Sequence, residues 1–228
     1  MKKLLYILTL IMFISCSYNN EQKANNIDTR SKPEIVEKNI QILDTAKIDS
    51  YSQELKVWLD YYEKYSIKLT DFEFVNEMSL PNISATVDTF DLAKDIYEPF
   101  YKYSPDNLII LDLTSYNIIL ERNDNNEYVS YAGEVDSEVS IKDLKNKKWQ
   151  RLLFVGSLYV IEDGFWINNN QLLIVGQFDN EYQTKVKSFI CFVDIDKNII
   201  QTFENINWVD IHCDYIEKVR YPNIKKAE

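Results

Sequence analysis

The sequence has few of the residues on which the most recognisable active sites depend. It contains four glycines and one histidine in 228 residues, and no GxSxG, HExxH, CxxC or P-loop pattern occurs in it. So few glycines exclude the glycine-rich loops that cradle phosphates, and one imidazole falls short of the usual zinc spacing patterns. We therefore expect no catalytic residues, no metal and no cofactor, and a protein that is not an enzyme.

Cysteine is also scarce, with Cys16, Cys191 and Cys213 as the complete set. Cys191 lies in an apolar, strand-like segment, where a free cysteine packs as a small hydrophobic residue. An oxidising compartment would instead allow a disulfide between Cys191 and Cys213, although spacing alone does not show the geometry that a bridge needs. His212 adjoins Cys213, but a Cys–His nucleophile pair also needs a third, orienting group in space. We therefore expect a structural role for His212.

The N-terminal apolar run is too short to cross a bilayer, which needs about 20 residues. Residues 4–14 are apolar in the main and follow two lysines, a pattern typical of secretory signal peptides. Residues 13–16, with Ser15 before Cys16, resemble the cleavage box of bacterial lipoproteins, in which the cysteine becomes the lipid-bearing first residue.

This resemblance implies that residues 1–15 are a signal peptide and that Cys16 carries a lipid. It places the protein in the cell envelope, anchored to a membrane, with the outer membrane favoured and the folded part facing the periplasm or the cell surface. An uncleaved anchor or a soluble secreted protein is the alternative.

Basic residues are the minority, because 25 lysines and arginines face 36 aspartates and glutamates, for a formal net charge of −11. This balance argues against nucleic acid as a partner, since affinity for a phosphate backbone comes mainly from Lys and Arg. What the chain has in abundance is hydrophobic residues, at 46%, and aromatic residues, at 14%. Aromatic and β-branched side chains suit pleated sheets, so this composition favours a packed, β-rich fold.

The order of patterns along the chain predicts a tether followed by one globular domain. Residues 16–33 are polar, with little to bury, and should form the lipidated, flexible tether. Residues 34–228 should form the domain, helical over 34–69 and mainly β over 70–228. Ser50 to Gln53 has the spacing of a capping box, so we expect the firm helix to begin near residue 50. Its apolar residues recur at three- and four-residue steps: Tyr51, Leu55, Trp58, Leu59, Tyr62 and Tyr65.

From residue 71 the hydrophobic period changes from that of a helix to that of a strand. Phe72, Phe74 and Met78 alternate with acids, which predicts one apolar side. Residues 89–98 should form a short helix that ends at Pro99. Beyond about residue 100 we expect strands joined by Asn/Asp turns at 123–126, 168–170 and 196–198. Residues 194–198 also have the start of a calcium loop, but its glycine and closing glutamate are missing, so we interpret them as a hairpin turn.

The second half of the chain contains a degenerate repeat. Residues 106–111 match residues 170–175, and residues 139–144 match residues 190–195, with about thirteen extra residues in the first copy, enough for an inserted hairpin. The order of strands and turns resembles that of β-propeller blades over residues 100–205. Because two blades leave sheet edges that must be covered, we expect an α+β, mainly β fold: an open propeller-like sheet or β-sandwich with the N-terminal helical segment packed on it.

Aromatic residues are the remaining candidates for a binding site. Tyr97, Tyr101, Tyr103 and Trp149 lie just before or within the repeat, where exposed aromatic side chains could anchor a protein or stack on sugar rings. We therefore expect a lipid-anchored envelope protein that acts as a binding or scaffold module for a protein or glycan partner. One alternative is an exported immunity or inhibitor protein that blocks a toxin or hydrolase through an acidic surface. The other is a carboxylate-dependent envelope hydrolase, which would need two facing carboxylates in a cleft.

Overall fold

The computed structural model describes residues 48, 50–210 and 214–227, and this part of the chain is mainly β. Its helical elements are short: α2 (Lys56–Tyr62), the 3-10 turns η1 (Glu63–Tyr65), η2 (Leu69–Asp71), η3 (Leu92–Lys94) and η4 (Glu98–Phe100), and the π-helical turn η5 (Ile216–Arg220). The strands are β1 (Phe72–Ser79), β2 (Ser84–Thr86), β3 (Lys102–Tyr103), β4 (Ile109–Asp112), β5 (Ile118–Arg122), β6 (Tyr128–Ala132), β7 (Ser137–Asp143), β8 (Lys148–Val155), β9 (Tyr159–Trp166), β10 (Gln171–Asp179), β11 (Val186–Asp194), β12 (Ile199–Asn205) and β13 (Lys225–Lys226).

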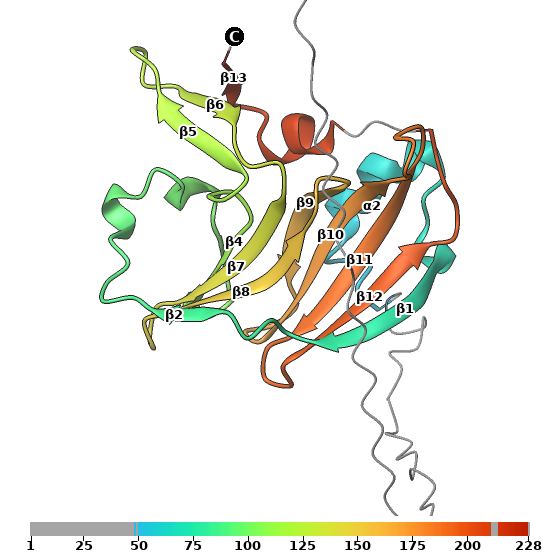
Figure 1. Cartoon of the computed structure of the whole chain (residues 1–228), viewed down its shortest axis with the longest axis horizontal. Helices are drawn as coiled ribbons and strands as arrows, with labels where there is room; N and C mark the ends of the chain where they lie inside the picture. The colour runs from blue at the N-terminus through green and yellow to red at the C-terminus, as the bar shows by residue number, and fades with distance from the viewer. Residues whose placement is uncertain (1–47, 49, 211–213, 228) are drawn as a thin grey trace, which may run out of the picture. The chain divides into compact units, whose positions relative to one another are not determined.

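The described strands form three sheets. Sheet A has the order β9-β10-β11-β12-β1, sheet B the order β3-β4-β7-β8-β2, and the hairpin sheet the order β5-β6-β13. Figure 1 shows β1 and β2 following one another along the lower edges of sheets A and B. The hairpin β5–β6 is inserted between β4 and β7, which pair with each other, so the predicted insertion in the first repeat copy is confirmed.

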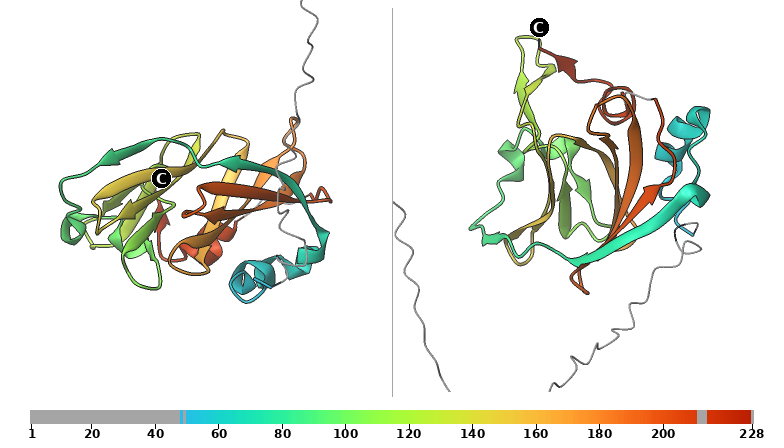
Figure 2. Two further views of the ribbon diagram at one scale, coloured as in Figure 1. Left: turned by 90° about the horizontal axis from the view of Figure 1, so that it is seen from below. Right: turned by 45° about the vertical axis from the view of Figure 1, so that its right-hand side comes forward.

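Sheet A is packed on both faces. One face meets sheet B through an apolar cluster that includes Leu172 and Ile174 from β10 and Val139 from β7. The other face meets α2 through a second cluster that includes Leu173 and Trp58. The right-hand view of Figure 2 shows sheet A between sheet B and α2. Successive side chains of β10 thus point alternately into the two apolar clusters, as expected for a strand that is buried on both sides.

Several predicted boundaries are wrong for local reasons. The firm helix begins at Lys56 and not near residue 50, with Leu55 at the N-cap and no side-chain cap there. Residues 50–55 form turns before it. Packing of Trp58 and Tyr62 against sheet A selects the helical segment, because tertiary burial of an apolar face outweighs a short capping pattern. The other predicted helical residues, 34–47, lie outside the described residues.

The short helix predicted over residues 89–98 is replaced by the 3-10 turns η3 and η4. Pro99 lies inside η4 and does not end a helix. The carboxylate of Asp95 accepts the backbone N–H of Tyr97 at 3.0 Å, which offers the backbone an alternative to helical hydrogen bonds.

The predicted single apolar side of β1 is also wrong, because a β-bulge interrupts the strand. Phe74 pairs with Phe203 and Asn76 with Thr202, so Val75 is the extra residue. A bulge reverses the alternation beyond it, which separates Met78 from Phe74 and leaves Met78 half exposed.

Among the described helices, none is long and apolar enough to cross a lipid bilayer.

Candidate functional site

A second bulge places two acidic residues side by side on sheet A. On β9, Asp163 pairs with Val175 and Ile161 with Gly176, so Glu162 has no partner on β10. The carboxylate of Glu162 accepts bonds from side chains of α2, and that of Asp163 accepts a bond from Tyr215, the N-cap residue of η5. Gly176 permits this arrangement, since a Cβ there would lie 2.2 Å from the carbonyl oxygen of Val160. Bulges of this kind re-aim side chains near functional sites.

The carboxylate of Glu162 is fully buried and receives both of its described side-chain hydrogen bonds from α2. The indole N–H of Trp58 donates to Oε2 at 2.6 Å, and the hydroxyl of Tyr62 donates to Oε1 at 2.5 Å. Trp58 and Tyr62 are four residues apart, so they lie on the same face of the helix. These two bonds offset much of the cost of burying the charge and hold the carboxylate in one orientation.

Asp163 joins three elements around its carboxylate. The hydroxyl of Tyr215 donates to Oδ2 at 3.0 Å, the backbone N–H of Gly164 donates to Oδ1 at 2.8 Å, and the ammonium of Lys102 forms an ion pair with Oδ1. Burial lowers the pKa of Lys102, and Asp163 opposes this shift. Burial, aided by the charge of Asp163, raises the pKa of Tyr215 far above its usual value, so Tyr215 keeps its proton as a donor.

Arg220 is the last residue of η5 and bonds to both β9 and the segment that follows β4. Its guanidinium donates to the carbonyl oxygen of Glu162 at 3.2 Å and to the hydroxyl of Thr114 at 3.0 Å. Thr114 in turn contacts the hydroxyl of Tyr221. A bond of 2.7 Å from the N–H of Tyr221 to the carbonyl of Ile216 gives η5 its π-helical spacing, which is a form that recurs at functional sites.

A pocket of about 330 Å³ lies beside the acidic pair, where β3, β9, η4 and η5 meet. Its charged residues are Lys102, Asp163 and Arg220. The aromatic residues of its wall are Phe100, Tyr101, Phe165, Tyr215 and Tyr221. Larger hollows of about 650, 560 and 510 Å³ lie elsewhere on the described chain, but none of the three joins buried charges from several elements in this way. We therefore take the 330 Å³ pocket, named the β9 pocket below, as the candidate site.

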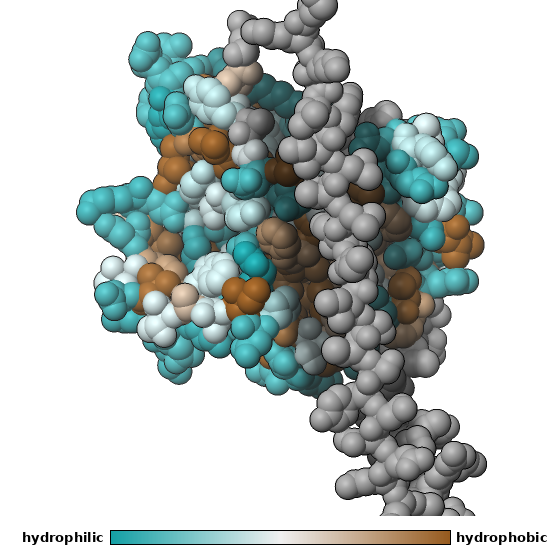
Figure 3. All heavy atoms as spheres, in the orientation of Figure 1, coloured by the Kyte–Doolittle hydropathy of each residue, from teal (hydrophilic) through white to brown (hydrophobic). Residues whose placement is uncertain are grey.

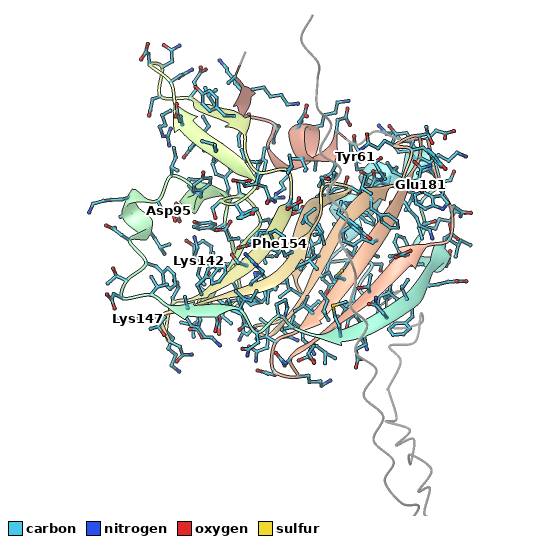
Figure 4. All side chains as sticks on the ribbon, viewed as in Figure 1. Tyr61, Asp95, Lys142, Lys147, Phe154 and Glu181 are labelled. Carbon is cyan, nitrogen blue, oxygen red and sulfur yellow. The ribbon has the colours of Figure 1, made fainter. Side chains whose placement is uncertain are left out.

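A separate polar network supports the Tyr101 wall of the β9 pocket from sheet B. Lys142 on β7 lies 3.2 Å from Asp112 and 3.6 Å from Asp95, and it also contacts the hydroxyl of Tyr101. Figure 4 shows Lys142 and Asp95 on the sheet B side, away from Tyr61 of α2. Burial acts to raise the pKa of Asp112, but Lys142 and the donors of Ser115 and Thr114 outweigh it, so the pKa lies below its usual value.

The structure brings one of the four predicted aromatic residues into the β9 pocket, namely Tyr101. The hydroxyl of Tyr97 donates to the carbonyl of Ile118 at 2.9 Å, and that of Tyr103 donates to Glu98 at 3.0 Å. Trp149 is half-buried on β8. Tyr97, Tyr103 and Trp149 therefore belong to the framework around sheet B, apart from the β9 pocket.

The predicted cysteine and turn features have mixed outcomes. Cys191 is buried, with its sulfur 3.8 Å from the hydroxyl oxygen of Thr202. Cys16, His212 and Cys213 lie outside the described residues, so the lipid attachment and the disulfide stay predictions. The hairpin turn after β11 is confirmed: Asp194 accepts the N–H of Lys197 at 3.0 Å. Within the described ranges, no cluster of three or more His, Cys, Asp or Glu side chains is placed to hold a metal ion.

Sequence reasoning missed the acidic pair Glu162 and Asp163. A signal was present, because two adjacent acids interrupt the apolar residues 158–167, and strict alternation would place one of them in each core. Two adjacent acids in a buried strand therefore indicate a bulge. Lys102 and Arg220 carried no such signal, since each is an isolated cation far from residue 163 in the chain.

No family model, curated protein or solved structure matches this chain. The fold and the chemistry of the β9 pocket therefore carry the functional argument by themselves.

Proposed function

We propose that this chain is a lipid-anchored envelope protein that acts by binding, and that the β9 pocket holds a group of its ligand. The supporting observation is that five aromatic residues line the pocket together with the charged residues Lys102, Asp163 and Arg220, whose side chains are held by surrounding hydrogen bonds and ion pairs. Ligand sites commonly have this composition, in which apolar walls give contact area and a few polar groups orient the ligand. Fixed donors also reduce the ordering cost of binding.

Binding is favoured over carboxylate catalysis because the two acids already have several partners. Each carboxylate oxygen of Glu162 accepts a bond from α2, and Asp163 accepts from Tyr215, Gly164 and Lys102. A general acid or base must instead exchange a proton with a substrate. These carboxylates are arranged to organise Tyr215 and Lys102 around the pocket.

The proposal includes two finer features of the molecule. The first is the membrane anchor at Cys16, supported by the short apolar run that ends there. Cys16→Ser should release the protein from membranes, and retention of that variant after a high-salt wash would contradict the anchor.

The second feature is that sheets A and B are degenerate copies of one blade-like unit, supported by their matching strand orders.

The β9 pocket can be tested by filling it. Val219 lies on its wall, so Val219→Trp should exclude the ligand while sheets A and B stay folded. Val75→Trp is the matched control, because Val75 is half exposed on β1. We would equilibrate the detergent-solubilised full chain with small molecules from the envelope and analyse it by native mass spectrometry. A ligand bound by the wild type and by Val75→Trp but not by Val219→Trp supports the proposal; equal binding by all three contradicts it.

A second candidate function, inhibition of or immunity to another protein, is favoured by exposed apolar residues near the hairpin sheet. Ile119 and Tyr131 are about half exposed and Val135 is 78% exposed. Figure 3 shows brown, apolar surface below the hairpin sheet. Exposed apolar groups of this kind mark protein contacts. Tyr131→Ser should then weaken the capture of an envelope protein, whereas Val219→Trp should not.

A further inference from the structure

Arg220 has a buried hydrogen-bond donor that its described neighbours leave unused. Its Nε atom is buried and has no partner among the described residues. The other two guanidinium nitrogens each donate one bond, to the carbonyl of Glu162 and the hydroxyl of Thr114. Because an arginine has five N–H groups, three of them, including that on Nε, have no described acceptor. A buried donor without an acceptor is costly, so its presence on a pocket wall calls for an explanation.

The geometry of Arg220 restricts what can satisfy this donor. Its guanidinium lies 4.5 Å from the centre of the Tyr221 ring, so an aromatic surface covers one of its faces. The Nε–H and a neighbouring N–H form a planar fork that matches the two oxygens of a carboxylate. Lys102 adds an ammonium on the same pocket wall, with a side chain one-third exposed.

We propose that the β9 pocket binds the carboxylate of a small organic acid, with Arg220 as the anchoring residue and Lys102 as the second cation. This inference rests on the proposed binding function and names the class of ligand. The walls of Phe100, Phe165 and Tyr215 contact the body of the ligand, and 330 Å³ accommodates a single ring. Both a sugar acid and an aromatic acid have this chemistry. A cationic ligand is disfavoured, because Asp163 already accepts bonds from Lys102, Tyr215 and Gly164.

Nuclear magnetic resonance of the ¹⁵N-labelled full chain tests the role of Arg220 directly, because arginine Nε–H groups give separate signals. The arginines of the chain are Arg30, Arg122, Arg151 and Arg220, so Arg220→Lys identifies the relevant signal by its loss. Glucuronate and phenylacetate are the probes, with glucose and phenylacetamide as their neutral counterparts. Acetate measures the response to an anion that has no ring.

We expect at least one acid to shift the Arg220 Nε–H signal in a saturable way, and its neutral counterpart to bind at least about tenfold more weakly. The preferred acid separates the sugar and aromatic sources. Arg220→Lys should weaken binding of that acid by a similar factor, because lysine keeps the charge but lacks the fork. Val219→Trp should abolish the response, and Val75→Trp should retain it.

Two results would overturn the inference. Equal binding of acids and neutral counterparts would show that the β9 pocket binds ligands without a carboxylate preference, so the proposed function would survive alone. No shift with any acid would show that another group, such as a buried water, satisfies Arg220. The acid and amide comparison uses the wild-type chain, so it holds even if Arg220→Lys fails to fold.

Discussion

Sheets A and B share one strand order but differ in what covers them. The central strands of sheet A are buried on both faces, and residues Leu172 to Val175 of β10 have no exposed surface. Sheet B is covered on one face by sheet A, and its strand β8 is mostly half-buried or exposed. Where sheet A has α2 on its second face, sheet B has the network of Lys142, Asp95 and Asp112. The comparison shows that the same connectivity supports an apolar interior or a polar network, depending on what packs against it.

The difference also explains where the β9 pocket lies. Among the described sheets, only sheet A has α2 and η5 beside its edge strand β9; α2 supplies Trp58 and Tyr62 to the acidic pair, and the N-cap residue of η5 supplies Tyr215. Sheet B contributes Lys102 and the Tyr101 wall. The pocket therefore forms at the edge where sheet A meets sheet B.

The largest effect should come from a charge placed between the two sheets. Ile174 is fully buried in the cluster that joins them, so Ile174→Asp should destabilise the fold by more than about 4 kcal/mol and unfold the domain. Ile119→Asp, on the half-exposed hairpin strand β5, is the control and should change stability by less than about 1 kcal/mol. Urea denaturation of both variants measures this. Wild-type stability of Ile174→Asp would show that sheets A and B do not share a core.

A smaller loss is expected where α2 meets sheet A. Trp58→Phe keeps an aromatic ring but removes the donor to Glu162, so it should cost about 1.5–3 kcal/mol, the usual value for a hydrogen bond to a charged group. Denaturant midpoints would measure the loss. A change near zero would mean that the α2 side of sheet A is held by apolar packing alone.

The polar face of sheet B should respond to pH. The pKa of Asp112 is lowered on folding, so its contribution is present above its unfolded pKa of about 3.9 and is lost as the pH falls through the folded value. In Lys142→Met the chief opposing charge is gone, and burial should raise the folded pKa instead. This variant should lose about 1–3 kcal/mol at pH 7 and regain part of it on acidification. Thermal melting of both proteins between pH 3 and pH 7 tests whether the dependence of stability on pH differs in sign. If the stability of Lys142→Met changes with pH in parallel with that of the wild type, the prediction is wrong.

The smallest effect should come from the solvent face of α2. Lys56 and Asp60 form an ion pair of 2.6 Å with both side chains more than half exposed, so Lys56→Ala should cost about 0.3–0.5 kcal/mol. The same melts, repeated at high salt, should show little difference between variant and wild type. A loss as large as that of Trp58→Phe would mean that α2 is held by its exposed face.

Much of the β architecture could be predicted from local patterns. The Asn/Asp segments at 123–126 and 196–198 are turns, with Asn126 and Asn198 at positive φ, because asparagine tolerates this conformation better than most residues. The apolar runs of β10 and β11 belong to strands that are buried on both faces. The start of α2 and the 3-10 turns near Pro99 could not be predicted, since burial and side-chain bonds to the backbone outweighed the local signals.

The amino-acid sequence by itself determined most of the strand segments and the turns between them, because these depend on residues close together in the chain. Only the tertiary structure decided the bulge at Val75, since it depends on how β1 registers against β12. It also decided the β9 pocket, in which Lys102, Asp163 and Arg220 meet from distant parts of the chain. Pairing and packing between distant segments set the positions of these charges, and no local pattern contains that information.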